Sequence, residues 1–137
     1  MNRQNFDNLI VNLTAIQNYA KDIHYNCKGD NFYGNHLFAD RIGDGLSDYI
    51  DQLKEICLLG HEIKPLHSSE YLNRAASVVP LDISFSEMSE LLVNTLMIIE
   101  NIKDVSKGDE NLLGAIAQDL QNNVGLINAM YGDLKNV

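Results

Sequence analysis

The sequence contains few prolines, few cysteines and few basic residues, and each shortage argues against a class of protein. Proline and cysteine occur 2 times each, and Cys27 and Cys57 form no Cys-x-x-Cys pair. Two such thiols cannot hold a disulfide scaffold together, so reduced cysteines are expected. Only 10 lysines and arginines oppose 19 acidic residues, which gives a formal net charge of −9. General attraction to DNA, RNA or an anionic membrane requires a basic surface and is not expected.

Long apolar segments are missing as well. No run approaches the ~20 apolar residues that span a bilayer, and residues 1–24 lack an uninterrupted apolar segment followed by a small-residue cleavage site. We therefore predict no transmembrane helix and no secretory signal, and we expect a cytoplasmic protein. The 137 residues suit a single domain, 1–137, that is large enough to bury a core.

The rest of the sequence is dominated by residues in helical periodicity. Apolar residues recur at three- and four-residue steps through residues 6–23, and residues 29–30 interrupt the pattern. A second helix is predicted over about 31–59, because Gly60 is a typical stop signal. Both prolines fall in the link that follows, which we interpret as a long connection with a short helix at 69–76.

Two more helices are predicted in the C-terminal half. Ser84 is a good N-cap, and Glu87 three residues later completes a capping box for a helix that carries apolar residues up to Val105. Residues 107–109 break the pattern, and the last helix covers about 112–130. Two helical hairpins joined by one long crossover form the ferritin-like topology. The predicted fold is thus all-α, a ferritin-like four-helix bundle with a short extra helix in the central connection.

Four side chains of chemical interest share one face of the second predicted helix. With His36 at zero and about 100° per residue, Asp40 falls at about 40°, Asp51 at about 60° and Glu55 at about 100° on the helical wheel. Apolar residues occupy a separate arc between roughly 200° and 280°: Phe38, Ile42, Leu46, Tyr49, Leu53 and Ile56. The helix therefore has an acidic, histidine-bearing face that points away from its own core.

Distance along the helix divides these residues into two groups. His36 and Asp51 are about 22 Å apart at a rise of about 1.5 Å per residue, whereas the ligands of one iron or zinc ion each lie about 2 Å from it. His24 can join His36, because the first helix turns into the second around Gly29. Asp51 and Glu55 are one turn apart and can form a second half-site.

Two separate half-sites on one outward face predict a site shared between two chains. In an isologous dimer, the histidine pair of one chain meets Asp51 and Glu55 of the other, and the reverse contact follows by symmetry. Asp40 can hydrogen-bond a ligand or reach a second ion. Imidazole and carboxylate ligands without thiolate suit Fe(II), and also Mn(II) or Zn(II). The Glu-x-x-His motif of a di-iron centre inside one bundle does not occur in the sequence.

This segment resembles the Dps family, the miniferritins. The resemblance covers almost the whole chain in helix order, and its specific part is residues 24–60. The stretches "HYNCKG", "NFYGNH", "FAD" and "DQLKE" follow the family's pattern. That pattern is a histidine motif, an aromatic-rich start to the second helix, a second histidine and a later Asp-x-x-x-Glu.

The resemblance implies both ligands and a function. His24 and His36 match the family's ferroxidase histidines, and Asp40 matches the acid beside them. Asp51 and Glu55 match the carboxylates that a second subunit contributes across the dimer interface. Family membership implies a dodecameric hollow shell, a homo-oligomer built from two-fold dimers. In such a shell Fe(II) is oxidised, preferentially by hydrogen peroxide, and stored as ferric mineral.

Some positions depart from the family's pattern. Tyr25 stands where the family usually has tryptophan, Asn35 replaces an apolar residue, and Asn111 stands where an acid is common. Asp119 matches one of the acids that line the family's iron-entry pores. The chain has no Lys-rich tail and ends in "DLKNV", so direct DNA binding is not expected.

These features leave more than one function open. The first is an iron-storing ferroxidase. The alternative is a Dps-like helical shell or interaction protein with weak or no ferroxidase activity, and a third is buffering of Zn(II) or Mn(II) without redox turnover. We interpret His61 and His67 as ordinary residues of the connection, and the two cysteines as packing or surface thiols.

Overall fold

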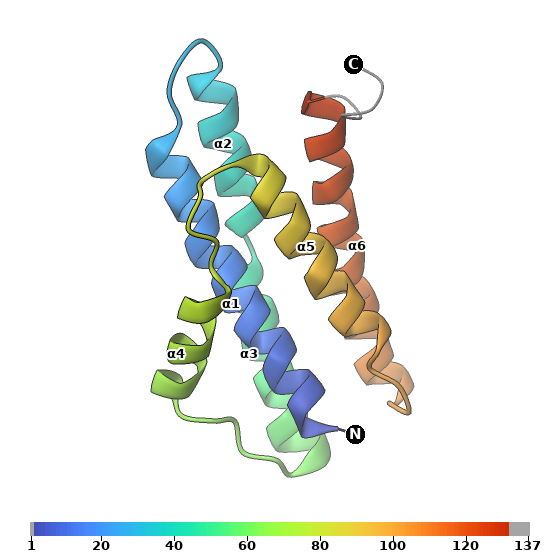
Figure 1. Ribbon diagram of the computed structural model, residues 1–137. Coiled ribbons are helices and arrows are strands. Elements are labelled where there is room, and N and C mark those ends of the chain that lie inside the picture. The colour runs from blue at the N-terminus through green and yellow to red at the C-terminus, as the bar shows by residue number, and fades with distance from the viewer. Residues whose placement is uncertain (1, 132–137) are drawn as a thin grey trace.

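Residues 2–131, the part of the chain that the computed structural model describes, form an all-helical fold (Figure 1). The helices are α1 (Arg3–Asn26), α2 (Phe32–Gly43), α3 (Leu46–Glu55), α4 (Ser68–Val78), α5 (Phe85–Glu100) and α6 (Lys107–Tyr131), and a π-helical turn, η1 (Ile56–Gly60), continues α3. The predicted all-α class is confirmed, and α4 is the short helix predicted at 69–76. None of the helices within residues 2–131 combines the length and the apolar character needed to cross a bilayer.

Helix α1 lies at the centre of the packing. It contacts α2, α3, α4 and α5, and α5 packs in turn against α6. In Figure 1 the consecutive helices α2 and α3 run along α1, and α5 and α6 form a second pair of long helices. The long helices together bury one hydrophobic core, which includes Leu9, Tyr19, Ile42, Leu53, Leu92 and Ile116.

The second predicted helix is not continuous. The sequence pattern predicts one helix over 31–59, whereas α2 ends at Gly43 and α3 begins only after Gly45. Asp44 is extended, and Gly45 has a φ of 78°, a left-handed conformation that favours glycine. Gly43 also permits close approach to α1, because a Cβ there would lie 3.2 Å from the Cβ of Ala20. The prediction of one helix was therefore wrong, since apolar periodicity continues through a break that the glycines create.

The break leaves the two faces of this segment in place. The residues predicted to face the core are buried or half-buried on both sides of the break: Phe38, Ile42, Leu46, Tyr49, Leu53 and Ile56. Asp40 before the break and Asp51 after it are exposed. Angles computed for one straight helix do not apply across Gly45, but an inward apolar face and an outward acidic face persist.

The last two long helices are joined at a different place from the one predicted. α5 ends at Glu100 rather than near Val105, and residues 107–109 belong to the first turn of α6 instead of breaking a helix. The Ser106 hydroxyl accepts a hydrogen bond of 3.1 Å from the Asp109 amide. Ser106 therefore caps the first turn of α6, which lets the helix begin before its glycine.

Ser84 caps α5 as predicted, but the second hydrogen bond of the capping box is replaced. The Ser84 hydroxyl accepts from the Glu87 amide at 3.1 Å. The Ser84 amide donates instead to Tyr19 Oη at 3.0 Å, and Tyr19 Oη donates to the Asp82 carbonyl at 2.5 Å. The buried phenol of Tyr19 thus ties the end of the long link to α1, through residues that no local motif connects.

Candidate metal centre

The end of α1 and the first turns of α2 bring His24 and His36 together. Their imidazole rings are stacked, with centroids 3.6 Å apart and planes inclined by 18°. His24 Nδ1 lies 2.8 Å from the backbone carbonyl oxygen of His36, and His36 Nδ1 lies 2.8 Å from that of His24. Gly29, with a φ of 92°, allows the chain to turn back between the two helices.

These reciprocal hydrogen bonds determine which ring nitrogen can bind a ligand. A carbonyl oxygen only accepts, so each Nδ1 must carry a proton and donate it. In the neutral ring the lone pair then lies on Nε2. Histidines that bind metals commonly donate their other N–H to a carbonyl in this way, which orients the ring. His24 and His36, both half-buried, therefore form a pair of nitrogen donors with the tautomer already selected.

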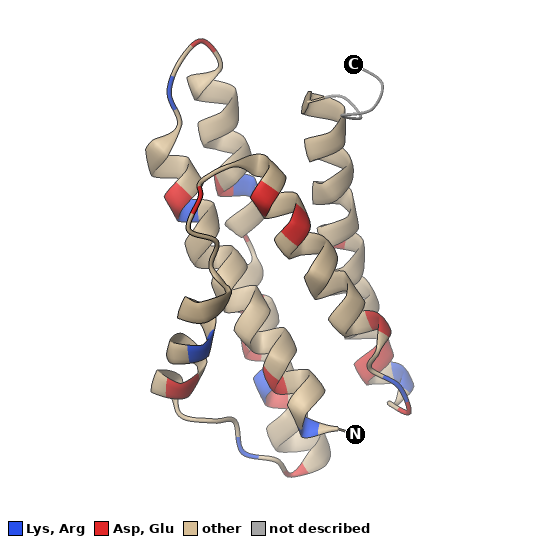
Figure 2. Cartoon of the chain, viewed as in Figure 1, with Lys and Arg blue, Asp and Glu red and all other residues tan. Residues whose placement is uncertain are grey.

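Aromatic side chains surround the histidine pair. Phe32 stacks on His36 with ring centroids 5.0 Å apart, and Tyr25 meets the edge of His24 at 5.1 Å. Tyr25 and Tyr33 are 74% and 72% exposed. Figure 2 shows that the first turns of α2 carry no charged residue. Aromatic rings thus border the pair on the side of the first turns of α2.

Asp40 lies one turn beyond His36, but its carboxylate has a partner within the chain. Lys21 Nζ is 2.9 Å from Asp40 Oδ1, and both side chains are about half exposed. The hydrogen bond and the charge of Lys21 hold the pKa of the Asp40 carboxyl below its ordinary value, and the two histidines act in the same direction. Asp40 is therefore an ionised group next to the histidine pair whose charge Lys21 already balances.

Asp51 and Glu55 lie on α3, one turn apart, and both are exposed. Glu55 lines a groove of about 620 Å³ between α3 and α6, together with residues that include Leu59 and Asn111. Within residues 2–131 neither carboxylate takes part in an ion pair. These two side chains are therefore accessible to a ligand from outside the chain.

The single chain does not bring the two groups of residues together. Among the described residues, no three His, Cys, Asp or Glu side chains lie close enough to hold one metal ion. His24 and His36 form one pair, and Asp51 and Glu55 form another. The described part of one chain therefore does not form the predicted four-ligand site by itself.

Asp119, predicted to line a pore, is an exposed residue of α6 that accepts a hydrogen bond from the Tyr49 hydroxyl on α3. This hydrogen bond raises the pKa of Tyr49 to about 12, and burial and the charge of Asp119 add to the effect. Within one chain, Asp119 therefore contributes to the contact between α3 and α6.

Two histidines that looked ordinary in the sequence have defined partners. His61 Nε2 lies 2.6 Å from the carboxylate of Asp109, whose side chain is nearly buried. His67 caps α4, because its Nδ1 accepts a hydrogen bond of 3.1 Å from the Ser69 amide. The His67 cap could have been found as a polar side chain just before a helix. The His61–Asp109 pair has no local sequence signal, since it joins the residue after η1 to α6.

Comparison with known proteins adds no family to this description. No protein-family model matches the sequence, and no curated protein matches it. The likeness to Dps proteins therefore rests on the residue pattern between positions 24 and 60.

Proposed function

We propose that this protein is an iron-storing ferroxidase. It oxidises Fe(II), preferentially with hydrogen peroxide, at sites shared between two subunits, and it retains the product as ferric mineral in a hollow dodecameric shell. The observation that carries the proposal is the stacked His24–His36 pair, in which both Nδ1 atoms are engaged by backbone carbonyls. The resemblance of the surrounding segment to the Dps family supports the same assignment.

The proposed site is completed by a second copy of the chain. A two-fold axis across the outer face of α2 and α3 sets the histidines of one subunit against Asp51 and Glu55 of its partner. Exposed apolar residues occur near both half-sites, namely Leu37 on α2 and Leu58 and Leu59 on η1. Such residues suit a surface that another chain covers, because their burial contributes about 25 cal/mol per Å².

The proposal extends to the fold. α1 with α2–α3 and α5 with α6 correspond to two helical hairpins, and the long link between them contains α4. This order of elements supports a ferritin-like four-helix bundle. In that architecture the histidine pair lies on the outside of its own bundle, where a neighbouring subunit can reach it.

The chemistry assigned to the site requires anionic and neutral donors together. Two Fe(II) ions each lose one electron, and hydrogen peroxide takes both electrons and two protons to form two water molecules. Fe(III) is a harder cation than Fe(II), so carboxylate ligands stabilise the product. Asp51 and Glu55 supply that negative charge, while the imidazoles hold the incoming Fe(II). Asp40, already balanced by Lys21, adds little net charge.

Removal of the carboxylates tests the assignment. The double variant Asp51→Ala, Glu55→Ala should slow peroxide-dependent oxidation of Fe(II) by at least about tenfold, because one half of each site is lost. Both residues are exposed, so the circular dichroism spectrum and the thermal midpoint should change little. The rate is measured by stopped-flow absorbance of the ferric product under anaerobic loading.

A matched control removes two exposed acids elsewhere. Glu70→Ala, Glu100→Ala changes the net charge by the same amount at exposed positions on α4 and α5 and should keep the wild-type rate. Equal rates for wild type and the Asp51, Glu55 variant would show that iron is oxidised elsewhere.

A helical shell or interaction protein with weak or no ferroxidase activity is the second candidate. The ion pair between Lys21 and Asp40 favours this second candidate. The Lys21 ammonium already pairs with the carboxylate that lies nearest to the histidines, so this carboxylate is less available to a metal ion. Size-exclusion chromatography after loading with Fe(II) and peroxide separates the two functions. Iron that elutes with a particle much larger than the 15.4 kDa chain supports storage, and a large particle without iron supports the shell alone.

A further inference from the structure

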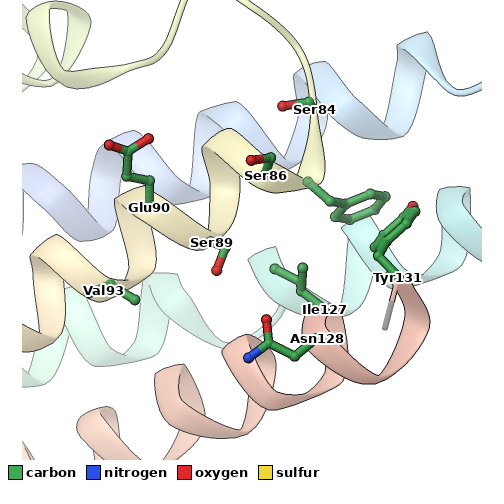
Figure 3. Close-up of a pocket in the computed structure, with 9 residues that line it drawn as sticks. Ser84, Ser86, Ser89, Glu90, Val93, Ile127, Asn128 and Tyr131 are labelled. Atoms are coloured by element: carbon green, nitrogen blue, oxygen red, sulfur yellow. The ribbon is translucent and has the colours of Figure 1, made fainter. Parts of the chain in front are cut away.

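One pocket beside α6 is apolar and another is polar. The apolar groove, of about 660 Å³, lies between α5 and α6, and Figure 3 shows the carboxylate of Glu90 directed away from Tyr131 at its end. Nothing in the structure shows what covers this groove. The polar pocket, of about 220 Å³, lies between α6 and the break that separates α2 from α3. It is different, because its wall contains an amide without a partner.

This amide belongs to Asn123, a residue of α6 that is only 8% exposed. Asn12 is buried to the same extent, and its amide donates a hydrogen bond of 3.1 Å to Thr95. The Asn123 amide has no such partner within residues 2–131. In that part of the chain no side-chain N or O atom that is closed off from solvent lacks a hydrogen bond, so the Asn123 amide must open onto the pocket. A ligand that pairs with this amide removes the cost of leaving it unsatisfied.

Two carboxylates lie at the mouth of the same pocket. Asp44 comes from the link between α2 and α3, Asp119 comes from α6, and both are exposed. Neither forms an ion pair within residues 2–131, although Arg41 also lines the pocket. The Tyr49 hydroxyl donates to Asp119 Oδ2 and leaves Oδ1 available. With one arginine and two aspartates, the wall carries a net charge of −1.

We propose that the pocket beside the break between α2 and α3 binds a calcium ion. Carboxylates and amide carbonyls are the ligands that Ca²⁺ takes from proteins, and water fills its remaining positions. The wall contains no histidine or cysteine, the ligands that favour zinc. Mg²⁺ requires near-ideal octahedral geometry, whereas Ca²⁺ accepts irregular sets of donors from separate elements. The volume of about 220 Å³ accommodates the ion with several waters, each of about 30 Å³ in the liquid.

The calcium site is separate from the proposed metal centre. It shares no residue with that centre and lies within one chain. Only two of its donors are acids, in keeping with the absence of any group of three His, Cys, Asp or Glu side chains among the described residues. A bound ion joins the link between α2 and α3 to α6, so Ca²⁺ should raise the thermal midpoint of the protein.

Calorimetric titration of Ca²⁺ into the iron-free, full-length protein in its native assembly tests the site. One ion should bind per chain, with a dissociation constant of about 10⁻⁴–10⁻³ M, the weak end of the range for protein calcium sites. Mg²⁺ should bind at least about tenfold more weakly, because it gives up its waters reluctantly. No saturable binding of Ca²⁺, or equal binding of Mg²⁺, would overturn the proposal.

Charge variants then locate the ion. Asp44→Asn, Asp119→Asn removes both charges but keeps an oxygen that accepts from Tyr49, and it should weaken Ca²⁺ binding by at least about tenfold. Glu70→Gln, Glu100→Gln removes two exposed acids that do not line the pocket and should bind like wild type. The site is wrong if the first variant keeps its affinity. It is equally wrong if both variants lose affinity alike, since diffuse negative charge then attracts the ion.

An uncharged substitution tests the buried amide. Asn123→Leu has a side chain of similar size and should weaken Ca²⁺ binding by at least about fivefold, since one oxygen ligand is lost. The thermal midpoint without calcium should not fall, because an unpaired polar group is removed. Asn128→Leu, at an exposed position of the same helix, is the matched control and should keep the wild-type affinity. Wild-type affinity in Asn123→Leu would contradict the proposed coordination.

A last variant separates this site from the proposed metal centre. Asp51→Ala, Glu55→Ala should bind Ca²⁺ like wild type, whatever its rate of iron oxidation, because neither residue lines the pocket. Loss of Ca²⁺ binding in this variant would place the ion at the carboxylates of α3 and overturn the proposal.

Discussion

Tyr49 and Tyr71 are two tyrosines whose hydroxyls donate to carboxylates on other helices. Tyr49 donates to Asp119, and Tyr71 donates to Asp7 Oδ1 at 2.8 Å. The pKa of each tyrosine is raised from 10.0 to about 12. For Tyr49 the hydrogen bond to Asp119 is the largest cause, and for Tyr71 it is burial. At the scale of single residues, helix contacts thus depend on protonated phenols.

This dependence predicts a loss of stability in alkaline solution. Between pH 10 and about 12 the unfolded chain releases the phenol protons while the folded chain retains them. The folded state then binds more protons, so the free energy of unfolding falls as the pH rises through this window. Below pH 10 the contribution is fully present. Urea denaturation at several alkaline pH values measures the slope.

Single substitutions identify the residues responsible. Tyr49→Phe and Tyr71→Phe should each make the alkaline decline shallower, because each substitution removes one proton that the folded chain retains. Tyr33→Phe is the control, since this exposed phenol has no hydrogen-bond partner among the described residues. A decline that is the same in all three variants would mean that other groups govern alkaline unfolding.

At the scale of helices, the break between α2 and α3 depends on one backbone conformation. Gly45 has a φ of 78°, and a Cβ at this position would meet no atom within 4 Å. Any cost of a side chain here is therefore conformational and not steric contact with a neighbour. Gly45→Ala should lower the free energy of unfolding by about 1 kcal/mol, the cost of a left-handed residue with a Cβ.

A second glycine provides a control of opposite sign. Gly114 lies within α6, and a Cβ there would also meet no atom within 4 Å. Gly114→Ala should raise the free energy of unfolding by about 0.5–1 kcal/mol, because alanine favours helix. If Gly45→Ala were instead as stabilising as Gly114→Ala, α2 and α3 would form one continuous helix in solution. Chemical denaturation of the two variants measures both effects.

At the scale of the whole molecule, the proposed site requires residues from two chains. This requirement predicts complementation between two inactive proteins. One carries His24→Ala, His36→Ala and the other carries Asp51→Ala, Glu55→Ala. When they are co-expressed, about half of the dimers contain one chain of each kind, and one of the two sites in each is intact. About a quarter of the wild-type ferroxidase activity should therefore return.

The control is a mixture of the two separately purified variants under conditions in which subunits do not exchange. This mixture should remain inactive. Co-assembled protein with no recovered activity, in particles shown by mass spectrometry to contain both chains, would contradict a shared site.

The helices themselves were largely predictable from the sequence. Apolar periodicity located α1 and most of α5 and α6, and Ser84 marked the start of α5. Such signals are local, since the residues that set them lie within a turn or two of one another. The ends were less predictable: Ser106 starts α6 early, and Gly45 interrupts a periodic segment.

The residue types of the candidate site and the pairing of His24 with His36 were predictable. Spacing placed Asp51 and Glu55 on one face, and the turn at Gly29 allowed His24 to approach His36. The carbonyl hydrogen bonds that select the histidine tautomer were not predictable, because they depend on how α1 and α2 cross. The pairing of Asp40 with Lys21 has the same origin.

The amino-acid sequence alone determined most of the helices, the acidic charge and the two groups of candidate ligands. Each of these depends on composition or on neighbours close in the chain. The tertiary structure decided which distant side chains meet. His61 with Asp109, Tyr19 with the end of the long link, and the pocket between α5 and α6 exist only once the helices pack. Packing joins residues dozens of positions apart, and no local pattern encodes that proximity.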